Sequence, residues 1–314
     1  MKHNIKITII LLSMFLLAQL IGLAVIYAYH PVKMPVEING TMQNVTTNPL
    51  PYGLEPPEVK PESSLISILF AFAIAFTILF FIMRLHKTYL VVLMRFWFFA
   101  VIAIALGIVI NIFLRDYFIN SAVISLLIGA FLSFIKVFRR NMILHNLTEL
   151  AVYPGIAAII VPILNLPTII ILLVVISVYD LWAVWHSGFM QKLANFQMKE
   201  VKVFGGFFVP YMTKKQRDKL KQARLSKSAR VKGKIKSMKI SLAILGGGDV
   251  VFPIITSGIV LRTFGFVPAL IVIACSTIAL AILFLFSQKG KFYPAMPFIT
   301  AGLFAGIILG ALAA

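Results

Sequence analysis

The sequence has little charge and almost no cysteine. Only 12% of its 314 residues are charged, while 61% are hydrophobic, and the mean hydropathy is +0.99. Soluble domains carry about twice that share of charged residues. The composition therefore excludes a soluble protein, because so few charged side chains cannot cover a water-facing surface. The single Cys275 lies in an apolar run, which excludes a disulfide scaffold.

Long apolar runs indicate a polytopic membrane protein. A helix needs about 20 apolar residues to cross a bilayer, and continuous runs favour helices over the alternating strands of a membrane barrel. We therefore predict an all-α fold with nine transmembrane helices. The predicted segments are 7–29, 65–83, 90–113, 121–137, 150–164, 168–185, 240–261, 266–286 and 294–313.

The basic residues are distributed unevenly between the two sides of such a bundle. All but four of the 29 Lys and Arg side chains fall on the side of the N-terminus. The positive-inside rule then predicts a cytosolic N-terminus and a C-terminus outside. We divide the chain into helices one to six in 1–185 with an irregular extracytosolic loop at 30–63, a basic cytosolic connection at 186–239, and helices seven to nine in 240–314.

The basic connection predicts contact with lipid. Residues 213–239 carry twelve Lys or Arg side chains among 27 residues, without an aromatic side chain between them. Stacking surfaces for bases are therefore missing, and we expect a solvated linker that touches anionic lipid of the bilayer. Nucleic acid is not an expected partner.

Two of the ten acidic residues, Asp180 and Asp249, fall inside predicted spanning segments. An ionisable side chain costs about 2.5 to 3.5 kcal/mol at the centre of a spanning helix, so it is a functional candidate. If the two helices are neighbours, the carboxyl groups share a proton in a site of low dielectric constant. Such a pair performs aspartic hydrolysis with water and needs no metal or other cofactor. The alternative is that each aspartate only binds a neighbouring helix.

Three consecutive glycines precede the second aspartate. Residues 246–248 weaken a helix and leave room for another backbone beside Asp249, and Pro253 removes a helix hydrogen bond soon after. The alternative is close packing of helices through small residues.

These motifs resemble those of a known family. Residues 179–180, Tyr-Asp, and residues 246–249, Gly-Gly-Gly-Asp, resemble the YD and GxGD motifs of the presenilin and signal peptide peptidase family of intramembrane aspartyl proteases. The family's Pro-Ala-Leu motif resembles residues 294–297, Pro-Ala-Met-Pro, with Met296 in place of leucine. A literal Pro-Ala-Leu at 268–270 opens the eighth segment, on the opposite side from both aspartates.

The resemblance implies an enzyme. The expected activity is that of an aspartic endopeptidase, which cleaves within or near transmembrane segments of membrane proteins or signal peptides. Asp180 and Asp249 would be its catalytic dyad, without cofactor or metal. Roles in binding substrate or shaping the site are implied for Tyr179, Gly246, Gly247, Gly248, Pro294, Ala295, Met296 and Pro297.

The resemblance also implies a cellular setting. The orientation is similar to that of presenilin, and the short chain is similar to a compact microbial or archaeal homologue in a prokaryotic cell membrane. We expect it to act without obligatory partner subunits.

Other classes of protein remain alternatives. Ion-coupled secondary transporters also bury aspartates beside broken helices, although inverted repeats are not visible here. Prepilin peptidases share GxGD but would have fewer spans and no proline motif in the last helix. A non-catalytic scaffold would tolerate replacement of either aspartate.

Overall fold

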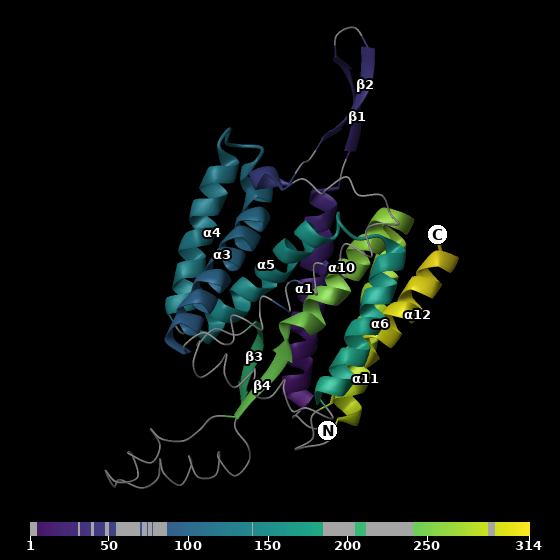
Figure 1. Cartoon of the computed structure of the whole chain (residues 1–314). Helices are drawn as coiled ribbons and strands as arrows, with labels where there is room; N and C mark the ends of the chain where they lie inside the picture. The colour runs from purple at the N-terminus through teal and green to yellow at the C-terminus, as the bar shows by residue number, and fades with distance from the viewer. Residues whose placement is uncertain are drawn as a thin grey trace.

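The computed structural model is a helical bundle with a two-stranded sheet toward each end (Figure 1). It describes residues 5–30, 32–38, 41–47, 50–54, 70, 74, 77, 87–139, 141–184, 205–211, 241–287 and 293–314. The helices are α1 (Ile5–Ala28), α3 (Lys87–Leu114), α4 (Ser121–Phe138), α5 (Met142–Ile160), α6 (Leu166–Trp182), α10 (Gly247–Phe264), α11 (Phe266–Phe286) and α12 (Met296–Leu312). A short 3₁₀ turn spans Pro51–Gly53.

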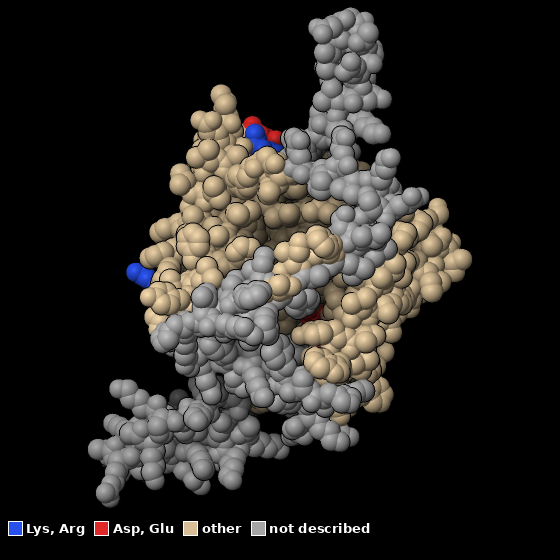
Figure 2. Space-filling view, in the orientation of Figure 1, with Lys and Arg blue, Asp and Glu red and all other residues tan. Residues whose placement is uncertain are grey.

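The helices agree with most of the predicted spans. Six of them are long and apolar enough to cross a membrane, and α6 and α12 are shorter apolar helices. Eight of the nine predicted segments thus contain a described helix, while almost all of segment 65–83 lies outside the described residues. The mostly uncharged surface in Figure 2 fits helices that face lipid.

The strands correct two predictions. An antiparallel hairpin of β1 (Val32–Ile38) and β2 (Thr41–Thr47) stands where we expected an irregular loop. The strands β3 (Gly206–Tyr211) and β4 (Ser241–Gly246) pair antiparallel, so the predicted helix from residue 240 is wrong for its first turns. Pairing with β3 stabilises the extended backbone there, and α10 begins only at Gly247. The all-α prediction holds for the bundle alone.

The core lies where α1, α5, α6, α10, α11 and α12 meet. Within it, α1 contacts α5, α10 and α11, while α6 contacts α10 and α12. The helices α3 and α4 pack together and join the bundle mainly through α5, and α3 also contacts α1. In Figure 1 the N-terminal end of α1 and the C-terminal end of α12 lie at opposite ends, with the β1–β2 hairpin at the end of the C-terminus.

A glycine allows the close approach of α5 to α3. The backbone of Gly155 faces the backbone of α3 so closely that an added Cβ atom would overlap the carbonyl group of Ala105. A backbone carbonyl cannot rotate away as a side chain does, so this contact fixes the spacing of the two helices.

We predict that Gly155→Ala destabilises the bundle. Overpacking of this kind costs about 1 to 3 kcal/mol, so the temperature of thermal unfolding in detergent should fall by several degrees. Gly248→Ala is the matched control, because a Cβ atom there meets only Phe252, at 3.9 Å. Equal unfolding temperatures for the two variants would contradict the prediction.

Candidate active site

Asp180 is buried near the C-terminal end of α6, with only 5% of its surface exposed. The backbone N–H of Met296 donates a hydrogen bond of 3.1 Å to its Oδ2 atom. Met296 is the first residue of α12. The positive end of the α12 dipole therefore faces the carboxyl group, an arrangement that stabilises negative charge.

A second contact holds α6 against α12 one turn away. The hydroxyl groups of Ser177 and Thr300 lie 2.8 Å apart and share a hydrogen bond. Both side chains are buried. The two helices are thus joined at Asp180 and at Ser177, which fixes the carboxyl group against the start of α12.

Asp249 lies in the first turn of α10, because β4 replaces the helical turns predicted before it. Gly246 is the N-cap residue, and a Cβ atom there would lie 3.1 Å from Oδ2 of Asp249, so the carboxyl group lies against the Gly246 backbone. The unpaired amides of a first helical turn and the positive end of the helix dipole stabilise negative charge at this position. The next amide, of Gly247, donates to the carbonyl of Gly205 at 3.1 Å. The aspartate is thereby fixed at the junction of sheet and helix.

The structure brings the two aspartates together. The helices α6, α10 and α12 contact one another in pairs, and the carboxyl group of Asp180 acts electrostatically on that of Asp249. Because like charges repel strongly where water is scarce, two such groups hold a single proton between them. The pair can then supply a base for water and an acid for a carbonyl oxygen at once.

The remaining predicted site residues lie at different distances from this pair. Pro294 and Met296 are buried at the start of α12, and Ala295 and Pro297 are partly buried beside them. Tyr179 is 40% exposed, and its ring lies 6.4 Å from that of Trp182 on the outer side of α6. Its role in shaping the site therefore stays a prediction.

Tyr153 is a residue near the site that sequence reasoning missed. It is 3% exposed, and its ring packs edge-on against Phe207 at 5.4 Å. A Cβ atom added to Gly247 would lie 3.1 Å from the Tyr153 hydroxyl oxygen. That oxygen has no hydrogen-bond partner among the described residues. The only sequence signal was a tyrosine in an apolar segment, four residues after Glu149.

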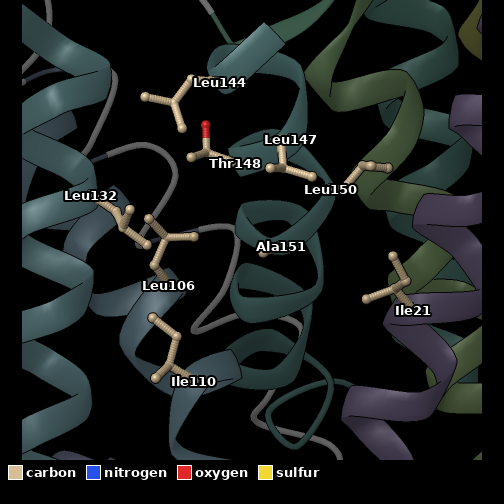
Figure 3. A pocket seen from close by; sticks show the side chains of 9 residues that line it. All are labelled: Ile21, Leu106, Ile110, Leu132, Leu144, Leu147, Thr148, Leu150 and Ala151. Carbon is tan, nitrogen blue, oxygen red and sulfur yellow. The ribbon is translucent and has the colours of Figure 1, made fainter. Parts of the chain in front are cut away.

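A separate apolar cavity lies away from the aspartates. It has a volume of about 320 Å³, and side chains of α1, α3, α4 and α5 line it (Figure 3). Thr148 is its one polar side chain. Neither aspartate lines it, so the dyad is not at this cavity. Atoms of Asp or Glu residues, coloured red, are visible instead in a hollow of the face shown in Figure 2.

Comparisons with known proteins agree with this geometry. A family model described as signal-peptide peptidase, presenilin aspartyl protease matches residues 12–314. A comparison with curated proteins found no match.

Two solved structures, each described as a presenilin family intramembrane aspartate protease, have a similar fold. The first, in space group C222, has a TM-score of 0.62 and 16% identity over 98% of this chain and 99% of that chain. The second, in space group P2, has a TM-score of 0.57 and 17% identity over 97% of each chain. Structural similarity at such low identity establishes the fold alone. The family model matches nearly the whole sequence and therefore establishes the family. The chain therefore belongs to the signal peptide peptidase and presenilin family of intramembrane aspartyl proteases.

Proposed function

We propose that Asp180 and Asp249 are the catalytic dyad with which this protease hydrolyses peptide bonds within or near transmembrane segments of membrane proteins or signal peptides. The observation that carries the proposal is the meeting of two carboxyl groups, each at the start of a helix: Asp180 is buried and accepts the Met296 N–H, and Asp249 is partly buried in the first turn of α10. The family match supports intramembrane proteolysis and does not support the transporter alternative.

The proposed reaction needs only the dyad and water. The ionised carboxylate takes a proton from a water molecule, whose oxygen attacks the carbonyl carbon of the scissile bond. The protonated partner donates a hydrogen bond to the carbonyl oxygen and stabilises the tetrahedral intermediate. As the C–N bond breaks, the departing nitrogen receives a proton from the dyad. The products are a carboxylic acid and an amine.

A transmembrane substrate must also unwind, because a helix hides its peptide bonds in its own hydrogen bonds. The outer edge of β4 offers backbone N–H and carbonyl groups that can replace the hydrogen bonds that the substrate loses. Phe207 lies opposite Leu245 and Val209 lies opposite Ala243 in the register of the sheet. Backbone groups of a strand alternate between its two sides.

The hydrogen bonds of β3 to α5 indicate which residues of β4 face outward. The N–H and carbonyl of Phe208 both bind a side chain of α5, so Phe208 faces away from β4. Ile244 lies opposite Phe208 and Gly246 lies opposite Gly206 in the sheet. Because backbone groups alternate along a strand, those of Ile244 and Gly246 therefore face away from β3. An extended substrate segment can pair with this edge, immediately before Asp249, by strand addition.

Replacement of either aspartate tests the dyad. We expect Asp180→Asn and Asp249→Asn each to lower the rate of cleavage of a single-span substrate in liposomes at least 1,000-fold, because asparagine can neither accept nor store the proton. Mass spectrometry of the products measures the loss. Asp116→Asn is the control, since this exposed side chain pairs with Arg115 at 3.7 Å at the far end of α3. Normal cleavage by either dyad variant would refute the proposal.

A proline in β4 tests strand addition. Proline is tolerated where a strand's N–H faces outward, so Ile244→Pro should keep the β3–β4 pairing but remove a donor from the substrate edge. We expect it to lower kcat/KM at least tenfold more than Ile244→Val, which keeps the N–H. Similar values for the two variants would contradict pairing at this edge.

The proposed setting is a prokaryotic cell membrane, with the N-terminus and the connection 186–239 in the cytosol. The asymmetry of Lys and Arg residues supports this orientation. Contact of the connection with anionic lipid and activity without partner subunits belong to the same proposal.

Labelling in intact cells tests the orientation. In a Cys275→Ala background, an impermeant thiol reagent should modify Thr46→Cys but not Ser228→Cys until the cells are opened. Modification in the reverse order would show the opposite orientation.

A further inference from the structure

The N-terminal part of α5 holds β3 in the way that a neighbouring strand would. The Asn146 side chain donates from Nδ2 to the Phe208 carbonyl at 2.8 Å and accepts the Phe208 N–H at Oδ1, at 3.0 Å. One amide side chain thus satisfies both backbone groups of one strand residue. An antiparallel partner strand makes this same pair of hydrogen bonds.

His145 extends the contact by one step of the strand. Its Nε2 atom lies 2.8 Å from the Gly206 carbonyl oxygen, two residues before Phe208. Because a carbonyl only accepts, Nε2 carries the hydrogen and donates it. The imidazole ring also lies 4.8 Å from the ring of Phe208. Pro210 is the next residue whose backbone faces this side of the strand, and proline has no N–H group.

A buried ion pair anchors this part of α5. Lys136 Nζ of α4 lies 2.7 Å from Glu149 Oε1 of α5, and the two side chains are 1% and 3% exposed. The same Glu149 oxygen lies 3.7 Å from His145 Nε2. Breaking a buried pair leaves an uncompensated charge, so the pair resists any shift of α5 against α4. The turn that carries His145 and Asn146 is therefore fixed in the bundle.

We propose that Asn146 and His145 are positioning residues for proteolysis. They occupy the outer edge of β3, so that, among the described residues, the outer edge of β4 is the one left for an extended substrate. They also fix the position of the sheet along α5. Because the Gly247 N–H donates to the Gly205 carbonyl, the same contacts fix β4 relative to Asp249. The hydrogen bonds of Asn146 and His145 to β3 thereby determine which peptide bond of the substrate meets the dyad. This inference rests on the proposed function.

The matched variants are Asn146→Ala, Asn146→Asp and Asn141→Ala. Asn146→Ala removes both hydrogen bonds to Phe208, whereas Asn146→Asp keeps the shape and the acceptor but replaces the donor with a carboxylate oxygen, which repels the Phe208 carbonyl. Asn141 caps the same helix by accepting hydrogen bonds from the N–H groups of Ile143 and Leu144, and these two hydrogen bonds do not involve β3. Asn141→Ala therefore weakens the start of α5 without removing the hydrogen bonds of Asn146 and His145 to β3.

Two measurements on the full chain in liposomes test the inference. Mass spectrometry gives the share of each product from a single-span substrate, and hydrogen exchange gives the protection of residues 205–211 without substrate. For both Asn146 variants we expect the share of the main cleavage site to fall at least twofold in favour of neighbouring bonds. Exchange in 205–211 should be at least tenfold faster. Asn141→Ala should keep the wild-type product ratio and exchange, even if its total rate falls.

The outcomes separate this inference from the proposed function. Wild-type product ratios or unchanged exchange in the Asn146 variants, beside dyad variants that are inactive, would overturn the positioning role and leave the protease assignment standing. If Asn146→Ala does not fold, Asn146→Asp decides by the same two measurements. A wild-type protein that cleaves no substrate, or dyad variants that still cleave, would overturn both proposals.

Discussion

A carboxyl group inside a membrane needs a stabilising partner, and here both aspartates lie at the start of a helix. Asp180 accepts a hydrogen bond from Met296 at the start of α12, and Asp249 lies in the first turn of α10, with its Oδ2 atom beside the backbone of Gly246. Backbone N–H groups of a first helical turn have no partner within the helix, and the helix dipole there favours negative charge. Two helix starts must therefore meet in the bundle, and the packing of α6 between α10 and α12 satisfies this condition.

The same constraint explains why a strand precedes α10. If the predicted helix continued back to residue 240, Asp249 would lie in the helix interior, where every backbone N–H bonds to a carbonyl of the preceding turn. Pairing of β4 with β3 makes α10 begin at Gly247, so that Asp249 lies in its first turn. Glycine suits the junction because a Cβ atom on Gly246 would lie only 3.1 Å from Oδ2 of Asp249.

Much of the bundle and the identity of the dyad were predictable from the sequence. Apolar runs locate helices because lipid demands them, and an aspartate within such a run is costly enough to indicate function. Methionine at position 296 has a volume similar to that of the leucine in the family's motif, so the substitution can be tolerated. The structure adds a stronger reason, because the contact of this residue with Asp180 is made by its backbone.

The β3–β4 sheet could not be predicted, because the apolar stretch 204–210 and its partner strand are far apart in sequence and neither shows a clear period on its own. Tertiary contacts decide such a pairing. Tyr153 was missed for a similar reason, since nothing in its own segment indicates that it packs beside Gly247.

The buried pair of Lys136 and Glu149 shows how local charge serves the distant site. Counted by sequence, Lys136 is one more basic residue at the cytosolic end of a span, and Glu149 a carboxylate at the mouth of the next. In the structure each neutralises the other inside the bundle, at 2.7 Å. A polar pair at this depth would be costly if α4 and α5 separated, so it holds the two helices in one arrangement. The charges thus give α5 a fixed position, and the side chains one turn before Glu149 can bind β3.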